Sequence, residues 1–182
     1  KNVRYFGKDE SLPDQIDLKA GPINLFYEAG DLRYIKYGDK EIIRRIYVAV
    51  RDRNWDTVKP ALSNLSMSIT DDSFNINYSV NNIQDNLDFC WEGNITGKAN
   101  GTITFTMDGL ARSTFWRNRI GFCILLPMEY AGSNCQIEHV NGEIEDSQFP
   151  KFIAPQRIIQ GRPSPVEPFS NMRALTCQVV PN

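Results

Sequence analysis

The sequence predicts an all-β protein, an antiparallel β-sandwich of about ten strands. Apolar and polar residues alternate with a period of two along several runs, as expected for strands with one buried face. These runs recur roughly every 8–12 residues and are separated by glycine, asparagine and aspartate. A helical spacing of apolar residues appears only weakly, over residues 56–64.

Strands are expected over residues 23–28, 32–37 and 42–50 in the first part of the chain. Gly30-Asp31 and Gly38-Asp39 supply the turns between them, because these residue types adopt turn conformations at low cost.

The clearest alternation follows in two runs, residues 65–69 and 74–80. Leucine, methionine, isoleucine, phenylalanine, tyrosine and valine take every second position, and the positions between them are serine, threonine or asparagine. Because Asp71-Asp72 forms a short polar link between the runs, they predict a β-hairpin.

The later strands are marked by Asn-Gly turns, in which both residues tolerate a positive φ. Residues 87–91 and 103–107 are expected to pair across a link that ends in Asn100-Gly101. Asn141-Gly142 separates two further expected strands, and a final strand-like run closes the chain: residues 135–140, 143–145 and 173–180.

Residues 149–169 differ from the rest because they contain five prolines. Proline fixes φ and lacks an N–H donor, so we expect an ordered irregular excursion over the sandwich or a strap toward a neighbouring domain. The length predicts that residues 1–182 form a single domain. The chain stops directly after a strand-like run, from which we expect this domain to belong to a longer protein.

The charge balance excludes two kinds of partner. Lys and Arg number 20 and Asp and Glu number 22, which gives a net charge of −2. Proteins that bind nucleic acid or an anionic membrane surface carry strongly basic patches instead. No apolar run approaches the ~20 residues of a membrane span. Residues 1–10 are polar and show no signal peptide, which favours the cytoplasm.

The cysteines and the one histidine do not match a metal site or a known catalytic motif. Cys90, Cys123, Cys135 and Cys177 form no Cys-x-x-Cys pair, so we expect reduced, buried thiols; two disulfides are the alternative in an oxidising compartment. There is no Gly-x-Ser-x-Gly motif, and a single histidine cannot build a multi-histidine metal site. We therefore expect neither a cofactor nor a metal.

Arginines and a tryptophan gather where two strand-like runs meet their turns. Arginine donates in a planar fork that suits carboxylates and polyol oxygens, and tryptophan can stack on a sugar face. These residues predict a rim site for a carbohydrate or sugar acid; the alternative is that the arginines pair with Asp52, Asp56, Glu138 or a neighbouring domain. The candidate substrate-binding residues are Arg51, Arg53, Trp55, Arg117, Asn118 and Arg119.

His139 is a separate candidate, because it is the one side chain with an unperturbed pKa near neutrality. It could act as a general base or donate a hydrogen bond to a ligand oxygen. The alternative is an exposed strand histidine beside a hairpin. Catalytic residues cannot be assigned from the sequence.

The same segments resemble the N-terminal region of the bacterial D-apionate lactonase family. The specific stretches are Arg51-Asp52-Arg53-Asn54-Trp55 and Arg117-Asn118-Arg119-Ile120-Gly121. The resemblance extends over residues 18–22, 31–35, 42–55, 101–105, 115–123 and 149–156.

This resemblance implies a cytoplasmic enzyme of sugar catabolism, here apiose catabolism, that hydrolyses the ester bond of a sugar-acid lactone. The chain would be its β-rich N-terminal domain, structural or substrate-shaping and inactive alone, and a missing C-terminal α/β domain would be its partner. The expected ligand is a sugar-acid lactone or a related carbohydrate. The alternative is a non-catalytic carbohydrate-binding or interdomain β-sandwich module.

Overall fold

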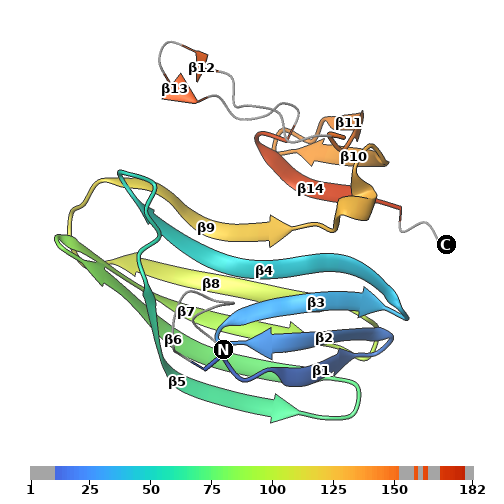
Figure 1. The fold of residues 1–182 in the computed structure, drawn as a ribbon, viewed down its shortest axis with the longest axis horizontal. Coiled ribbons are helices and arrows are strands. Elements are labelled where there is room, and N and C mark those ends of the chain that lie inside the picture. The colour runs from blue at the N-terminus through green and yellow to red at the C-terminus, as the bar shows by residue number, and fades with distance from the viewer. Residues whose placement is uncertain (1–10, 152–157, 160–161, 164–168, 179–182) are drawn as a thin grey trace. The chain divides into compact units, whose positions relative to one another are not determined.

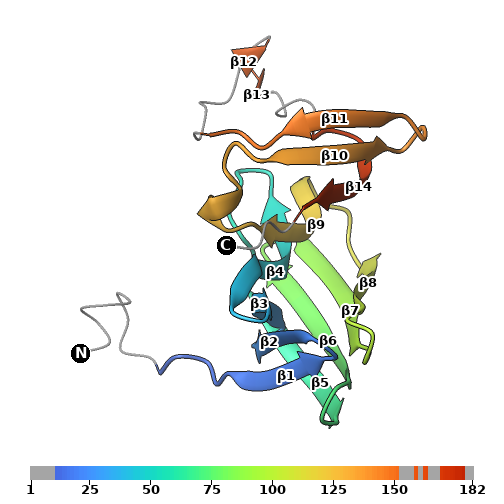
Figure 2. The same cartoon turned by 90° about the vertical axis from the view of Figure 1, so that its right-hand side faces the viewer.

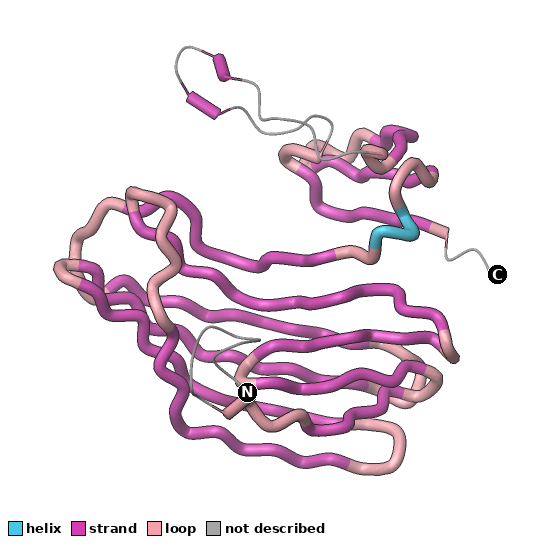
Figure 3. Tube along the Cα trace, viewed as in Figure 1, coloured by secondary structure: helices cyan, strands magenta, loops and turns pink. Residues whose placement is uncertain are grey.

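The computed structural model describes residues 11–151, 158–159, 162–163 and 169–178. The chain divides into two compact units, residues 1–126 and 127–182, which we describe separately (Figure 1). The described residues form twelve strands in three antiparallel sheets and one short additional strand pair, with a single turn of 3₁₀ helix (Figure 3). The predicted all-β class is confirmed.

The first unit contains a five-stranded sheet with the order β1-β2-β3-β4-β9. Consecutive strands pair through short turns, and β9 joins from later in the chain along β4, with Val50 opposite Ile120. The strands are β1 (Ile16–Ala20), β2 (Ile23–Glu28), β3 (Asp31–Tyr37), β4 (Lys40–Asp52) and β9 (Arg117–Leu125).

A four-stranded meander, β5-β6-β7-β8, forms the other layer of this unit (Figure 2). The hairpin of β6 and β7 pairs without interruption from Phe74 opposite Gly97 to Gln84 opposite Leu87. The strands are β5 (Pro60–Ile69), β6 (Phe74–Gln84), β7 (Leu87–Gly97) and β8 (Ile103–Ala111).

The hydrophobic core of the first unit consists of side chains from both sheets. Every second residue of β6 is buried from Phe74 to Val80, as the alternation predicts. The rings of Tyr27 and Tyr78, one from each sheet, pack edge to face with their centroids 6.3 Å apart. Burying one large apolar side chain contributes about 1.5–3 kcal/mol, so packing of the two sheets against each other stabilises the sandwich.

The second unit is built on a three-stranded antiparallel sheet with the order β11-β10-β14. Tyr130, Cys135, Ile137 and Phe149 are buried in it. Its described elements are the 3₁₀ helix η1 (Met128–Tyr130) and the strands β10 (Asn134–His139), β11 (Ile144–Gln148), β12 (Ile158–Ile159), β13 (Arg162–Pro163) and β14 (Met172–Cys177).

Some expected elements differ from the structure. Residues 56–64 form no helix; β5 begins at Pro60, because its backbone groups pair with β6. β1 and β9 are strands that the sequence did not predict. Most of the proline-rich segment 149–169 lies outside the described residues, and a single domain over the whole chain stays a prediction. No helix in the described part of the chain is long and apolar enough to cross a membrane.

Candidate functional site

The structure brings six of the seven predicted site residues to one end of the first unit. Arg51 lies near the end of β4, Arg53 and Trp55 lie in the turn that follows, and β9 begins beside them with Asp52 opposite Arg117. We call this set the arginine rim: Arg51, Arg53, Trp55, Arg117, Asn118 and Arg119. His139 belongs to the second unit.

The turn of the arginine rim is held by the carboxylate of Asp52. Its Oδ1 accepts hydrogen bonds from the backbone N–H of Asn54 at 2.8 Å and of Asp56 at 3.0 Å. Trp55, between them, has a φ of +73° and remains 42% exposed. The carboxylate of Asp52 thus stabilises the backbone of the turn, and the turn leaves the indole of Trp55 partly exposed to solvent.

The guanidinium groups of the rim have no acidic partner in the part of the chain that the structure describes. Within the described residues, none of Arg51, Arg53, Arg117 and Arg119 forms a salt bridge. Glu138, one of the expected partners, instead binds Arg173 at 3.0 Å. Arg119 lies over the Trp55 ring at 5.6 Å from the centroid, a cation–π arrangement that couples β9 to the turn. The rim therefore holds positive charge that is available to an anionic or hydroxylated ligand.

A hollow of about 190 Å³ opens beside the rim, where the β6–β7 turn approaches the Asp52 turn. Trp116 forms part of its wall and is 79% exposed. The lining residues supply amide and carboxylate oxygens as well as an aromatic face, which suits a polyhydroxylated ligand. They are Asp52, Arg53, Asn54, Gln84, Asp85, Asn86, Leu87 and Trp116.

His139 is held between two acceptors within the second unit. Its Nδ1 lies 3.2 Å from the carbonyl oxygen of Ser170, and its Nε2 lies 3.1 Å from Oε2 of Glu145. A neutral imidazole can donate to only one of them, whereas an imidazolium donates to both. The hydrogen bond with Glu145 accordingly raises the pKa of His139. His139 on β10 is thus hydrogen-bonded both to Glu145 on β11 and to the backbone at Ser170.

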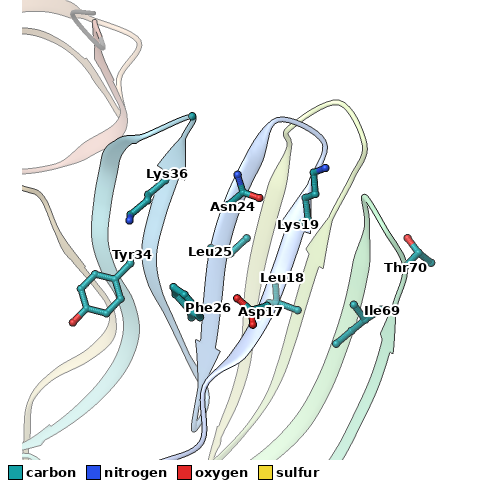
Figure 4. A pocket seen from close by; sticks show the side chains of 11 residues that line it. Asp17, Leu18, Lys19, Asn24, Leu25, Phe26, Tyr34, Lys36, Ile69 and Thr70 are labelled. Atoms are coloured by element: carbon teal, nitrogen blue, oxygen red, sulfur yellow. The ribbon is translucent and has the colours of Figure 1, made fainter. Parts of the chain in front are cut away.

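A second hollow, of about 450 Å³, lies on the outer face of β1, β2 and β3 (Figure 4). The register places Lys19 opposite Asn24 and Asn24 opposite Lys36, so amide and ammonium groups follow one another across the strands. The Phe26 and Tyr34 rings meet edge to face at 6.3 Å at its border. We call this the sheet-face hollow; its polar and aromatic lining residues are Asp17, Lys19, Asn24, Phe26, Tyr34, Lys36 and Thr70.

Comparison with known proteins assigns the chain to a family. Residues 3–182 match the family described as "D-apionate lactonase, N-terminal domain". The chain belongs to this family. It is similar to a D-apionate lactonase of Brucella anthropi, with 33% identity over 97% of the chain. The chain spans only 28% of that relative's length. No solved structure matches.

Sequence reasoning missed several residues around the rim of this lactonase-family domain. Asp85 and Asn86 form the turn between β6 and β7, and Gln84 is the last residue of β6; all three line the hollow beside the rim. Trp116 precedes β9, a strand that was not predicted. One signal was available in the sequence, since Trp116 directly precedes the arginine run that begins at Arg117. Among the described residues, no group of three or more His, Cys, Asp or Glu is placed to hold a metal ion.

Proposed function

We propose that this chain is the substrate-shaping domain of a lactone hydrolase that opens a sugar-acid lactone to the free acid. The arginine rim, with four guanidinium groups that have no carboxylate partner among the described residues, carries the proposal. The family match and the greater length of the Brucella anthropi relative support it, since they indicate a larger enzyme of which this domain is one part.

The reaction explains why such a rim is useful. Water attacks the ester carbonyl of the lactone, the ring C–O bond breaks, and the alkoxide that leaves takes a proton. Negative charge develops on the carbonyl oxygen and finally resides on the carboxylate product, and both accept hydrogen bonds from a guanidinium fork. Trp55 and Trp116 offer apolar faces to the C–H groups of the ligand. We assign activation of water to the remainder of the protein.

The test uses the full-length enzyme with D-apionolactone as the substrate. Arg53→Ala and Arg119→Ala each remove one charged donor from the rim. A hydrogen bond to a charged group contributes roughly 1.5–3 kcal/mol, so each substitution is expected to lower kcat/KM about ten- to a hundredfold. If the effect is on ground-state binding, it appears mainly as an increase in KM.

Lys98→Ala is the matched control, because it also removes one exposed positive charge. Lys98 follows the last residue of β7, whereas Leu87, the first residue of that strand, lines the rim hollow. At about 3.3 Å per residue the two ends of β7 lie roughly 33 Å apart. The control should leave kcat/KM unchanged. Rim variants that lower thermal stability while turnover stays intact would favour a purely structural role for these arginines.

A second candidate function is a carbohydrate-binding module that uses the sheet-face hollow. Its specific support is the row of Lys19, Asn24 and Lys36 beside the half-buried ring of Phe26. In that case sugar acids bind this chain without the rest of the enzyme, and Phe26→Ala abolishes the heat of binding in calorimetry. Retention of binding in Phe26→Ala together with its loss in Arg119→Ala would exclude this candidate in favour of the rim.

A further inference from the structure

Two of the four cysteines face each other in the sheet of the second unit. In the antiparallel pair of β10 and β14, Cys135 lies directly opposite Cys177. The next partners along the same face are Ile137 and Leu175. The sequence does not single out this pair among the four cysteines, because 41 residues separate the two (177 − 135 − 1) and no Cys-x-x-Cys motif is present.

The register is compatible with a covalent bond. Residues directly opposite each other in an antiparallel ladder have Cα atoms about 4.5 or 5.5 Å apart, depending on the type of pair. Disulfides usually span Cα distances of about 4.4–6.8 Å, so both types fall in the permitted range. Side chains of directly opposed residues also leave the sheet on the same side. The backbone therefore does not need to move for the two sulfurs to bond.

The two thiols are free in the structure, and their residues are direct partners in the ladder. Cys135 is only 6% exposed, whereas Cys177 is half-buried. Burial raises the pKa of both thiols, and the adjacent Cys177 raises that of Cys135 further. Cys90 and Cys123 lie in different sheets of the first unit, and neither has a cysteine as its register partner.

We propose that Cys135 and Cys177 form a reversible disulfide that covalently fastens β10 to β14, a redox-sensitive modification site in the second unit. The inference is independent of the proposed function, because it rests only on the register of this sheet. A sheet of three short strands has a small core, and small cores depend strongly on such cross-links.

The oxidant we propose is a small-molecule disulfide such as oxidised glutathione. The thiolate of Cys177, the more exposed cysteine, attacks one sulfur of the oxidant; the protein–glutathione bond forms and one glutathione thiolate leaves and takes up a proton. The thiolate of Cys135 then attacks the Cys177 sulfur and releases the second glutathione. The two cysteine thiols are oxidised, the glutathione disulfide is reduced, and their two protons end on the two glutathione thiols.

The experiment treats the reduced full-length protein with glutathione buffers of increasing oxidising strength, quenches it with an alkylating reagent, and maps the peptides by mass spectrometry. A cross-linked peptide pair containing Cys135 and Cys177 is expected to appear and to disappear again on reduction. Cys90 and Cys123 should remain alkylated over the same range. Oxidation of Cys90 or Cys123 before this pair, or alkylation of both Cys135 and Cys177 throughout, would overturn the proposal.

Variants separate the cross-link from nonspecific oxidation. In Cys135→Ala, Cys177 has no resolving partner, so the mixed disulfide with glutathione should accumulate on Cys177. Cys123→Ala is the matched control and should form the Cys135–Cys177 bond as the unaltered protein does. Because Cys135→Ala could destabilise the unit, the unaltered protein gives a second readout: its oxidised form should unfold the second unit at a higher urea concentration than its reduced form. Equal midpoints would contradict the fastening role.

Discussion

Asn82 is a polar side chain buried in the core of the first unit, with 2% of its surface exposed. Its Nδ2 donates to the carbonyl oxygen of Val58 at 2.9 Å, and its Oδ1 accepts from the indole N–H of Trp91 at 3.1 Å. The alternation in the sequence predicts a strand that ends at Val80, because the next inward position is this polar residue. β6 nevertheless continues to Gln84, since the two hydrogen bonds compensate for the burial of the amide.

Asn82→Ala is expected to destabilise the first unit by about 2–6 kcal/mol. The substitution leaves a buried indole N–H and a buried carbonyl without partners, and each such group costs roughly 1–3 kcal/mol. Chemical denaturation of the first unit measures the change. Gln84→Ala, which removes an exposed amide from the same strand, is the control and should change stability by no more than about 0.5 kcal/mol. A similar small change in Asn82→Ala would contradict the role of this network.

His139 gives the second unit a pH-dependent stability. Its pKa in the folded state is raised by the hydrogen bond with Glu145, so the folded protein binds the proton more tightly than the unfolded chain. The stabilisation is fully present below the unfolded value of about 6.5 and is lost as the pH rises through the higher folded value. The free energy of unfolding, measured with urea, should fall as the pH rises above about 6.5. Glu145→Gln should largely remove this fall. An equal decline in Glu145→Gln would exclude this pair as the cause.

At the scale of elements, glycines allow β6 and β7 to carry large aromatic rings on one face. A Cβ atom on Gly93 would lie 2.6 Å from Cζ of Tyr78, and one on Gly97 would lie 2.2 Å from Cε1 of Phe74. These glycines stand directly opposite the same aromatic residues in the ladder. The rings therefore fill the space above the glycines and extend into the core.

Gly93→Ala is expected to cost about 1–3 kcal/mol, because the new methyl group displaces the Tyr78 ring from a packed core. Thermal denaturation is the readout. The same substitution in a Tyr78→Leu background should cost less, since the clashing ring is gone. If the two costs are equal, the contact between Gly93 and Tyr78 does not limit packing here.

The elements that the sequence did not reveal have identifiable physical features. β9 begins with Arg117-Asn118-Arg119, which looks like a polar turn, and its apolar residues Phe122 and Ile124 remain exposed at the edge of the sheet. Of β5 only residues 65–69 were predicted, because a bulge between Ser63 and Ser66, with Asn64 at a φ of +54°, interrupts the alternation before them. Edge strands and bulges weaken the period-two signal because one face is not uniformly buried.

At the scale of the whole molecule, the sequence predicted that the rim residues lie together but not what surrounds them. The six rim residues come together because the end of β4 pairs with the start of β9. The hollow beside them depends on the β6–β7 turn, which local sequence cannot connect to the rim. Cys135 and Cys177 likewise lie opposite each other only because of the register between β10 and β14, which are far apart in the chain.

The central claim is that this domain shapes a lactone-binding rim and that the group which activates water lies in the remainder of the enzyme. The most direct measurement compares hydrolysis of D-apionolactone by residues 1–182 alone and by the full-length protein under identical conditions. We expect turnover by the full-length protein and none above the uncatalysed rate by residues 1–182. Turnover by residues 1–182 alone would contradict the account.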